Sequence, residues 1–330
     1  MPSDIGVAWP AKKFIRGYPE SYNATVQREL PWNLLAQVGY VGTLTVHQHT
    51  RANINYGLVG GGQASEILNQ KFGVTAGMTE GLAFEHMNYK SLQAQIQKRF
   101  LNGLQFQASY TFSKWMGLCC DEQGDGAPQI LIPQYMKLNW SLMPDDRTHN
   151  FEFSSIYQLP FGRGKKYANS GIASALAGGW QTNWVLSRYS GTPITINAPG
   201  DSLNAPGNSQ IADKVKPSVH IFGAHGLVSP YFDTTAFAPV SAARFGTAGF
   251  DSLRGPGYAN LDTSLFRTFP IKDALKMQFR LEALNLFNHP NFGNPDNGVT
   301  DGSFGLIGGT NAGSRLIAER YYKFGLRMMF

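Results

Sequence analysis

The chain has 330 residues and a formal net charge of +6, and charged residues make up only 15% of it, against about a quarter in typical globular domains. The positive charge is spread along the chain rather than clustered, which argues against a nucleic-acid-binding surface. No apolar run approaches the roughly 20 residues of a membrane-spanning helix, whereas aromatic residues (13%) and glycine (37 residues) are abundant.

Nine segments in which apolar and polar residues alternate predict nine β-strands, because successive side chains of a strand point to opposite faces. In the fourth of them, Phe106 and Tyr110 share one face, and Gln105 and Gln107 share the other. In chain order the predicted strands span residues 21–30, 33–45, 88–100, 103–115, 149–159, 179–190, 258–268, 274–285 and 318–330.

The connections between these strands alternate strictly in length. Short links at 31–32, 101–102, 160–178 and 269–273 alternate with long loops at 46–87, 116–148, 191–257 and 286–317. Compact soluble domains rarely contain loops of that length. Four such loops on the same side match the short periplasmic turns and long outer loops of a bacterial outer-membrane barrel. We therefore predict an irregular segment over 1–20 and an all-β, antiparallel transmembrane β-barrel segment over 21–330.

The alternation also assigns side chains to the two faces of that barrel. The amide-rich polar face is predicted to line the lumen, where it can hydrogen-bond polar solutes or a plug. Its candidates are Gln93, Gln95, Gln97, Arg99, Gln105, Gln107, Lys276, Arg280, Glu282, Lys323 and Arg327. The apolar face is predicted to meet lipid and to supply aromatic girdles. Its candidates are Phe106, Tyr110, Phe112, Tyr157, Trp180, Trp184, Phe279, Phe324 and Phe330.

The last predicted strand ends on an aromatic residue, Phe330. A chain terminus in a soluble protein is normally polar and frayed, whereas bacterial outer-membrane barrels commonly end in this way. With the short links in the periplasm, Phe330 lies at the periplasmic rim, and we expect this strand to engage the barrel-assembly machinery. An odd number of antiparallel strands leaves the outermost two parallel, so nine strands are interpreted as part of a larger barrel.

Several longer motifs carry a family resemblance. They are 88–114 (NYKSLQAQIQKRFLNGLQFQASYTFSK), 157–165 (YQLPFGRGK) followed by 178–181 (GGWQ) and 190–193 (SGTP), and 279–292 (FRLEALNLFNHPNF). Together they resemble the carboxyl-terminal barrel portion of TonB-dependent outer-membrane receptors of the Oar-like type, which are abundant in acidobacteria.

The resemblance implies a barrel of about 22 strands filled by an amino-terminal plug, with a TonB-contacting motif and a carboxypeptidase-regulatory-like immunoglobulin-type domain ahead of it. The chain resembles only the barrel portion, so we expect it to contain no plug, and Met1 to Gly6 show no signal-peptide pattern. The expected function is import of a bulky nutrient, such as an oligosaccharide or a metal chelate, with the plug and the TonB system as partners. The alternatives are an adhesion or envelope-organising barrel without transport, and a secreted all-β carbohydrate-active protein.

Catalytic and cofactor motifs are not apparent: the sequence has no Gly-x-Ser-x-Gly elbow, no His-Glu-x-x-His helix and no calcium loop. We therefore expect neither enzymatic activity nor a cofactor. The acids Asp121, Glu122 and Asp125 are compatible with a calcium site or a glycosidase pair, but a solvated loop is favoured because such sites need fixed turn positions or separate strands.

Two further pairs have competing interpretations. His47 and His49 share a predicted strand face and are compatible with a metal site, but a polar strand end is favoured because no Cys or carboxylate accompanies them. Cys119 and Cys120 are adjacent, so they would form either a strained vicinal disulfide or a thiol pair.

Three loop features complete the predictions. The run from Gly60 to Gly62 is interpreted as a flexible outer loop, and the basic segment 163–166 as a solvated periplasmic turn. Tyr231, Phe232 and Phe237 are predicted to stack on sugars or other ligands from an outer loop.

Overall fold

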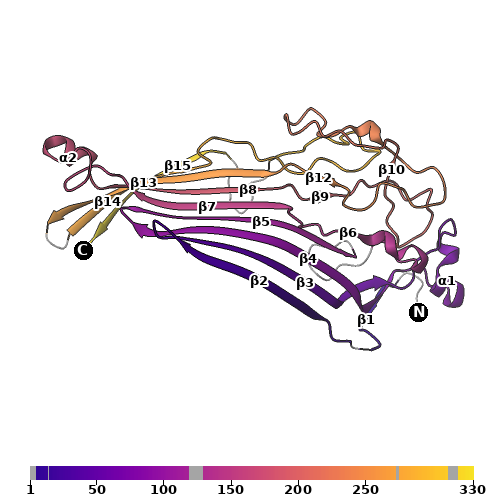
Figure 1. Ribbon diagram of the computed structural model, residues 1–330. Coiled ribbons are helices and arrows are strands. Elements are labelled where there is room, and N and C mark those ends of the chain that lie inside the picture. Colours follow the sequence, from indigo (N-terminus) through magenta and orange to yellow (C-terminus); the bar gives the residue numbers. More distant parts are fainter. Residues whose placement is uncertain (1–4, 14, 119–128, 273–274, 311–318) are drawn as a thin grey trace.

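The computed structural model describes residues 5–13, 15–118, 129–272, 275–310 and 319–330 (Figure 1). Nine long antiparallel strands form one sheet in the order β15-β14-β13-β8-β7-β5-β4-β3-β2. Their bounds are β2 Tyr18–Leu30, β3 Leu34–Asn53, β4 Met78–Leu101, β5 Leu104–Leu118, β7 His149–Gln158, β8 Trp180–Tyr189, β13 Tyr258–Lys272, β14 Leu275–Leu284 and β15 Tyr321–Met329. They correspond one to one to the nine predicted strands, so the all-β antiparallel fold class is confirmed.

Two short strands extend this sheet at its long-loop end. β1 (Val7–Trp9) runs parallel to β4, and β6 (Trp140–Leu142) runs antiparallel to β5. Since β1 lies within the segment predicted to be irregular, and β2 already begins at Tyr18, that segment contains regular structure.

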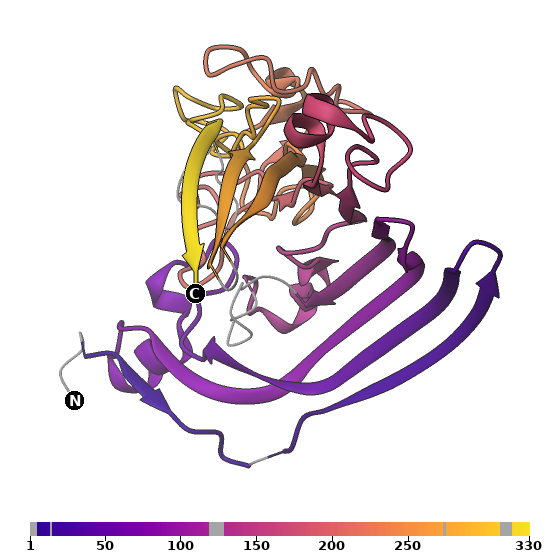
Figure 2. The same cartoon turned by 90° about the vertical axis from the view of Figure 1, so that its left-hand side faces the viewer.

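The sheet is strongly curved but open (Figure 2). Within the described chain, β2 and β15 are its two edges and do not pair with each other. All residues of β2 are exposed. The sheet therefore has the curvature of a barrel wall and two free edges.

Long and short connections lie at opposite ends of the strands, as predicted (Figure 1). The largest difference in bounds is at the first long loop, because β3 continues to Asn53 and β4 begins at Met78, which shortens the loop predicted at 46–87 to residues 54–77. Register shifts between Val46 and Gln48, and between Gln48 and His49, change the phase of the alternation there. The alternation of apolar and polar residues in the sequence is therefore lost before β3 and β4 end.

Two short links are true tight turns with left-handed residues. Pro31, Trp32 and Asn33 join β2 to β3, with positive φ angles at Trp32 and Asn33. Asn102 and Gly103 join β4 to β5, and both have positive φ angles, as a two-residue hairpin turn requires.

The third short link contains a helix, α2 (Gly171–Ala177). Arg267 of β13 donates hydrogen bonds to the carbonyl oxygens of Ala175 (2.6 Å) and Leu176 (2.8 Å), and Trp180 Nε1 donates to Leu176 (3.0 Å). These bonds give partners to carbonyl oxygens that the last turn of a helix leaves without intrahelical hydrogen bonds. Ile172 and Leu176 nevertheless remain 80% and 70% exposed.

The long connections contain the remaining short elements. These are η1 Gln63–Ser65, α1 Ile67–Phe72, η2 Pro133–Asn139, β9 Pro193–Ile194, β10 Asp213–Lys214, η3 Thr234–Ala236, β11 Phe237–Ala238 and β12 Leu253–Arg254. β9 pairs with β12, and β10 pairs with β11.

The buried apolar core lies in these connections rather than on either face of the sheet. We call residues 54–77, 129–148, 190–257 and 285–310 the loop assembly. One cluster is centred on Phe232, Ile196 and Ile307, and a second on Ile130 and Leu203. The long connections therefore form a packed body at one end of the sheet.

This packing corrects one prediction. Phe232 is fully buried, and Tyr231 and Phe237 are only 8% and 6% exposed, because all three belong to the first cluster. They stabilise the loop assembly and are not available to stack on a ligand.

Candidate functional site

The register of the sheet determines which side chains share a face, because directly opposed residues point the same way. Gln97 lies opposite Gln107, and Glu282 lies opposite Lys323. The same polar face carries the predicted lumen candidates Gln93, Gln95, Gln105, Lys276, Arg280 and Arg327. Arg99 lies in the irregular stretch of the ladder between Lys98 and Leu101, so the register does not place it.

The opposite face is apolar and uncovered. It carries the predicted candidates Phe106, Tyr110, Phe112, Tyr157, Trp180, Trp184, Phe279 and Phe324. Phe324 is 71% exposed, and Phe330, just beyond β15, is 93% exposed. An apolar surface of this extent marks contact with a membrane or a partner. Whether the polar face borders a lumen and this one borders lipid remains a prediction.

A polar pocket of about 390 Å³ lies in the loop assembly. Its polar wall is formed by Gln129, Thr195, Asn197, Asp251, Asn294 and Asn297, and Phe250 and Ile194 contribute apolar surface. Carboxamides carry both donors and acceptors, so this wall can hydrogen-bond a ligand rich in hydroxyl groups.

Asp251 is the buried acid of this pocket. Its carboxylate accepts hydrogen bonds from Thr195 Oγ1 (3.1 Å) and Ser141 Oγ (3.3 Å). Burial raises the pKa of Asp251 above its ordinary value, although these two hydrogen bonds act in the opposite direction. The carboxyl group therefore retains a proton more readily than an exposed aspartate.

The Asp146 carboxylate joins the loop assembly to the sheet. The Asp146 side chain is fully buried and accepts hydrogen bonds from the Arg254 guanidinium and from the backbone N–H of Trp115 in β5 (2.6 Å). Arg254 also donates to the carbonyl oxygens of Asp146 (3.0 Å) and Gly191 (3.1 Å). Three separate segments thus meet at one guanidinium.

The two histidines predicted at a strand end do not form a joint site. His47 has a positive φ at the bulge, and its ring lies 5.9 Å from that of His86. His49 Nε2 lies 2.9 Å from the carbonyl oxygen of Ile15. The prediction that the two share a regular strand face is wrong, because the bulge separates them. Among the described residues, no group of three or more His, Cys, Asp or Glu side chains is arranged to hold a metal ion.

The glycine run differs from its prediction as well. The backbone N–H of Gly60 donates to Leu203 (2.8 Å), and that of Gly62 donates to Asn204 (2.7 Å). Positive φ angles at both glycines permit this approach. The run is therefore an ordered contact between two connections.

Other predicted features have simpler outcomes. The basic side chains of 163–166 are exposed, as predicted for a solvated turn. Cys119, Cys120, Asp121, Glu122 and Asp125 lie outside the described residues.

The pocket residues were missed by sequence reasoning. Asp251 and Asn294 come from connections that have no periodicity, and only folding brings them together. The asparagine-rich stretch 285–297 is the one local signal that could have indicated polar recognition.

No helix in the described part of the chain has the length and apolar character needed to cross a bilayer.

The sequence matches the family described as outer membrane beta barrel domain over residues 2–318. Solved structures with a similar arrangement include the outer membrane transporter YddB from Escherichia coli (11% identity, covering 95% of this chain and 32% of that one, TM-score 0.49). Another is the ferric-catecholate import receptor Fiu from Escherichia coli K12 (12% identity, covering 96% and 28%, TM-score 0.44). The chain thus spans less than a third of the length of either protein. No curated protein matches it.

The family match covers nearly the whole chain, and the open antiparallel sheet with an uncovered apolar face agrees with it. The chain belongs to the outer membrane β-barrel domain family and is a protein of the bacterial outer membrane.

Proposed function

We propose that the chain is the carboxyl-terminal barrel part of a TonB-dependent transporter that imports a bulky polar nutrient, such as an oligosaccharide or a metal chelate. The observation that supports this most directly is the separation of the two sheet faces. In this proposal the apolar face meets lipid, and the polar face, with Gln97, Gln107 and Arg280, borders a water-filled or plugged lumen. The open edges β2 and β15 would pair with further strands of the same barrel.

The loop assembly supplies a place where a solute could first bind. Its pocket carries amide and carboxyl groups at the long-loop end of the barrel, which is the outer end in such proteins. Because the packed clusters around Phe232 and Ile130 hold the connections in place, the pocket is preformed. The expected ligand is rich in hydroxyl groups, and Thr195, Asn294 and Asn297 would bind it.

Dependence on TonB and on a plug rests on the motif resemblance alone. The test is uptake of labelled oligosaccharides and metal chelates by cells carrying the complete gene, a gene deletion, or a deletion of TonB. We expect both deletions to abolish uptake of the same compound. Uptake that persists without TonB would contradict the proposal.

A pocket variant makes the test specific. Asn294→Leu removes amide donors and adds apolar bulk to the wall, so uptake should fall while the protein still reaches the outer membrane. Lys137→Gln in η2 is a suitable control, because Lys137 is exposed and does not line this pocket.

A second candidate function is surface adhesion without transport. The packed loop assembly favours it, since an ordered outer surface can bind a partner without moving a solute. In that case deletion of the gene would reduce attachment, and deletion of TonB would not. The secreted soluble alternative is excluded by the family and its location in the outer membrane.

A further inference from the structure

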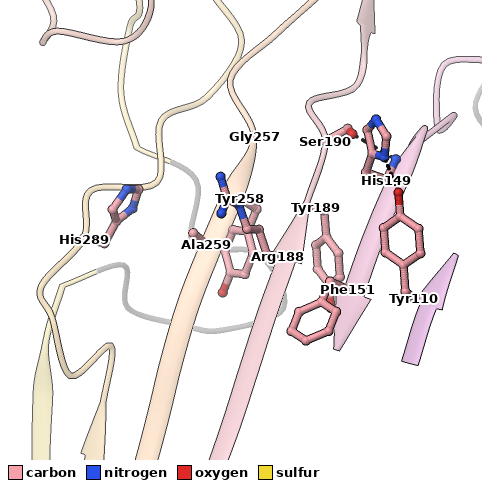
Figure 3. A pocket seen from close by; sticks show the side chains of 10 residues that line it. All are labelled: Tyr110, His149, Phe151, Arg188, Tyr189, Ser190, Gly257, Tyr258, Ala259 and His289. Atoms are coloured by element: carbon pink, nitrogen blue, oxygen red, sulfur yellow. Dashed lines mark hydrogen bonds between the residues drawn. The ribbon is translucent and has the colours of Figure 1, made fainter. Parts of the chain in front are cut away.

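A second pocket, of about 530 Å³, lies near the ends of β5, β7, β8 and β13 (Figure 3). Its lining includes Tyr110, His149, Phe151, Arg188, Ser190 and His289. Figure 3 shows His149 beside Tyr110 on one side, His289 on the other, and Arg188 between them. No carboxylate is among the described residues that line it.

The register places Tyr110, Phe151 and Arg188 on the face that we propose to be turned toward lipid. Tyr189 and Tyr258, which also line the pocket, lie on the opposite face at the strand ends. Phe151 lies opposite both Tyr110 and Arg188, and Tyr110 shares its face with Phe106. Along β8, Arg188 is separated from Trp180 at the short-link end by about 26 Å, at roughly 3.3 Å per residue. Barrel strands tilt by roughly 40°, so this length spans about 20 Å of an apolar band that is about 25 Å tall, and Arg188 lies in the outer part of that band.

The polar groups of the pocket are suited to an anion. Within the described part of the chain, the exposed Arg188 guanidinium makes no hydrogen bond or ion pair with another residue. His149 Nδ1 lies 2.7 Å from the Tyr110 hydroxyl, which fixes the orientation of the imidazole ring. The backbone N–H of His289 donates to Asn285 Oδ1 (2.9 Å), which holds this residue at the rim.

Two lysines extend the positive surface beside the pocket. Lys90 and Lys114 lie directly opposite each other on the same face, and Lys114 is two residues beyond Phe112, the partner of His149. Like charges in this position are destabilising unless an anion offsets them. Among the described residues of the long strands, Glu20 of the edge strand β2 lies on this face opposite Leu44, and it forms no ion pair with either lysine.

We propose that this surface binds the phosphorylated head group of an outer-leaflet glycolipid. Arg188 would engage the phosphate bidentately, Lys90 and Lys114 would neutralise further charge, and Phe151 would contact the acyl chains. The inference rests on the proposed orientation of the apolar face toward lipid. It goes beyond general contact with a membrane, because it names one phosphate-selective site.

The test uses the full chain in nonionic micelles, titrated with bisphosphorylated lipid A and with the same lipid after removal of its phosphates. Native mass spectrometry measures the bound fraction. We expect one bound lipid per chain, in monomers and oligomers alike, with the phosphorylated lipid only, and Arg188→Gln should weaken binding about tenfold, as expected for the loss of a charged hydrogen bond. Arg188→Lys should retain part of the affinity, and Lys137→Gln, with the same loss of charge elsewhere, should retain all of it.

Equal binding of the two lipids, or unchanged binding by Arg188→Gln, would overturn the inference. Competition by millimolar inorganic phosphate would also overturn it, because the site would then take free phosphate rather than a lipid. Circular dichroism of each variant establishes that its strands are intact. A chain that inserts into vesicles but does not select the phosphorylated lipid would contradict this inference without contradicting the proposed function.

Discussion

The buried carboxyl group of Asp251 has a consequence for stability that can be measured. Its pKa in the folded chain is raised by burial above the ordinary value of 3.8, so the folded state binds a proton at this carboxyl group more tightly than the unfolded state does. The free energy of unfolding contributed by Asp251 is thus present at low pH and declines as the pH rises above about 4. Asp251→Asn should therefore stabilise the loop assembly relative to wild type, increasingly so from pH 4 toward neutrality. Thermal unfolding of the two proteins across this range measures the difference.

Asp213 is a matched control of opposite sign. Hydrogen bonds from Arg244 lower its pKa, so its contribution is present at neutral pH and is lost as the pH falls below 3.8. Asp213→Asn should destabilise the assembly at neutral pH, and this effect should shrink toward low pH. The same sign for both substitutions would contradict the assignment.

At the scale of residues, the sequence predicts local conformation better than contacts. The link between β4 and β5 was predicted at 101–102, one residue early, although Asn102-Gly103 is the stronger hairpin signal because both residues adopt positive φ readily. The positive φ of His47 had no such signal, since the register between β3 and β4 imposes it. The surroundings of Asp251 come from three distant segments and could not be read from any local pattern.

At the scale of elements, two adjacent positions of β5 test the orientation of the sheet. Ala108 lies opposite Ile96 and Phe153 on the apolar face, whereas Ser109 lies opposite Gln95 and Glu152 on the polar face. Near the bilayer midplane, Arg on the lipid side of a barrel costs about 2–4 kcal/mol. Ala108→Arg should show this loss when folding into vesicles is titrated with urea, and Ser109→Arg should be close to wild type. Equal losses would mean that lipid does not bathe the apolar face.

The nine strands were predictable because their alternation follows directly from burial of one face and hydration of the other. The additional length of β3 and β4 was missed since the bulges shift the phase of that alternation. Helix α2 was also missed, although the spacing of Ile172 and Leu176 by four residues is a helical signal.

At the scale of the whole molecule, the two free edges decide how the isolated chain behaves. Unpaired backbone groups cost several kcal/mol each in hydrocarbon, and an exposed edge pairs readily with another strand. We expect the purified chain to self-associate in micelles through β2 and β15. Native mass spectrometry should show oligomers. In the monomeric fraction, hydrogen exchange should show better protection of the amides of the central strands β7 and β8 than of those of β2. A monodisperse monomer with fully protected β2 amides would contradict this expectation.

The open sheet itself was foreseen, because an odd number of antiparallel strands cannot close on its parallel ends. The packed loop assembly was not. Its core residues Ile194, Phe232 and Ile307 come from connections far apart in the chain and follow no period. Long connections between strands predict exposed loops by default, and only tertiary contacts distinguish an ordered body from a set of independent loops.

The length of β3 and β4 affects what the outside of the cell can reach. These strands have 20 and 24 residues, about twice the 9–11 that cross a bilayer. At about 3.3 Å per residue, the surplus carries their paired tips roughly 30 Å past the hydrocarbon along the strand direction. In the proposed orientation this surplus holds the whole loop assembly, to which 54–77 is bonded through Gly57, Gly60 and Gly62, away from the membrane, where an antibody or a phage would meet it first.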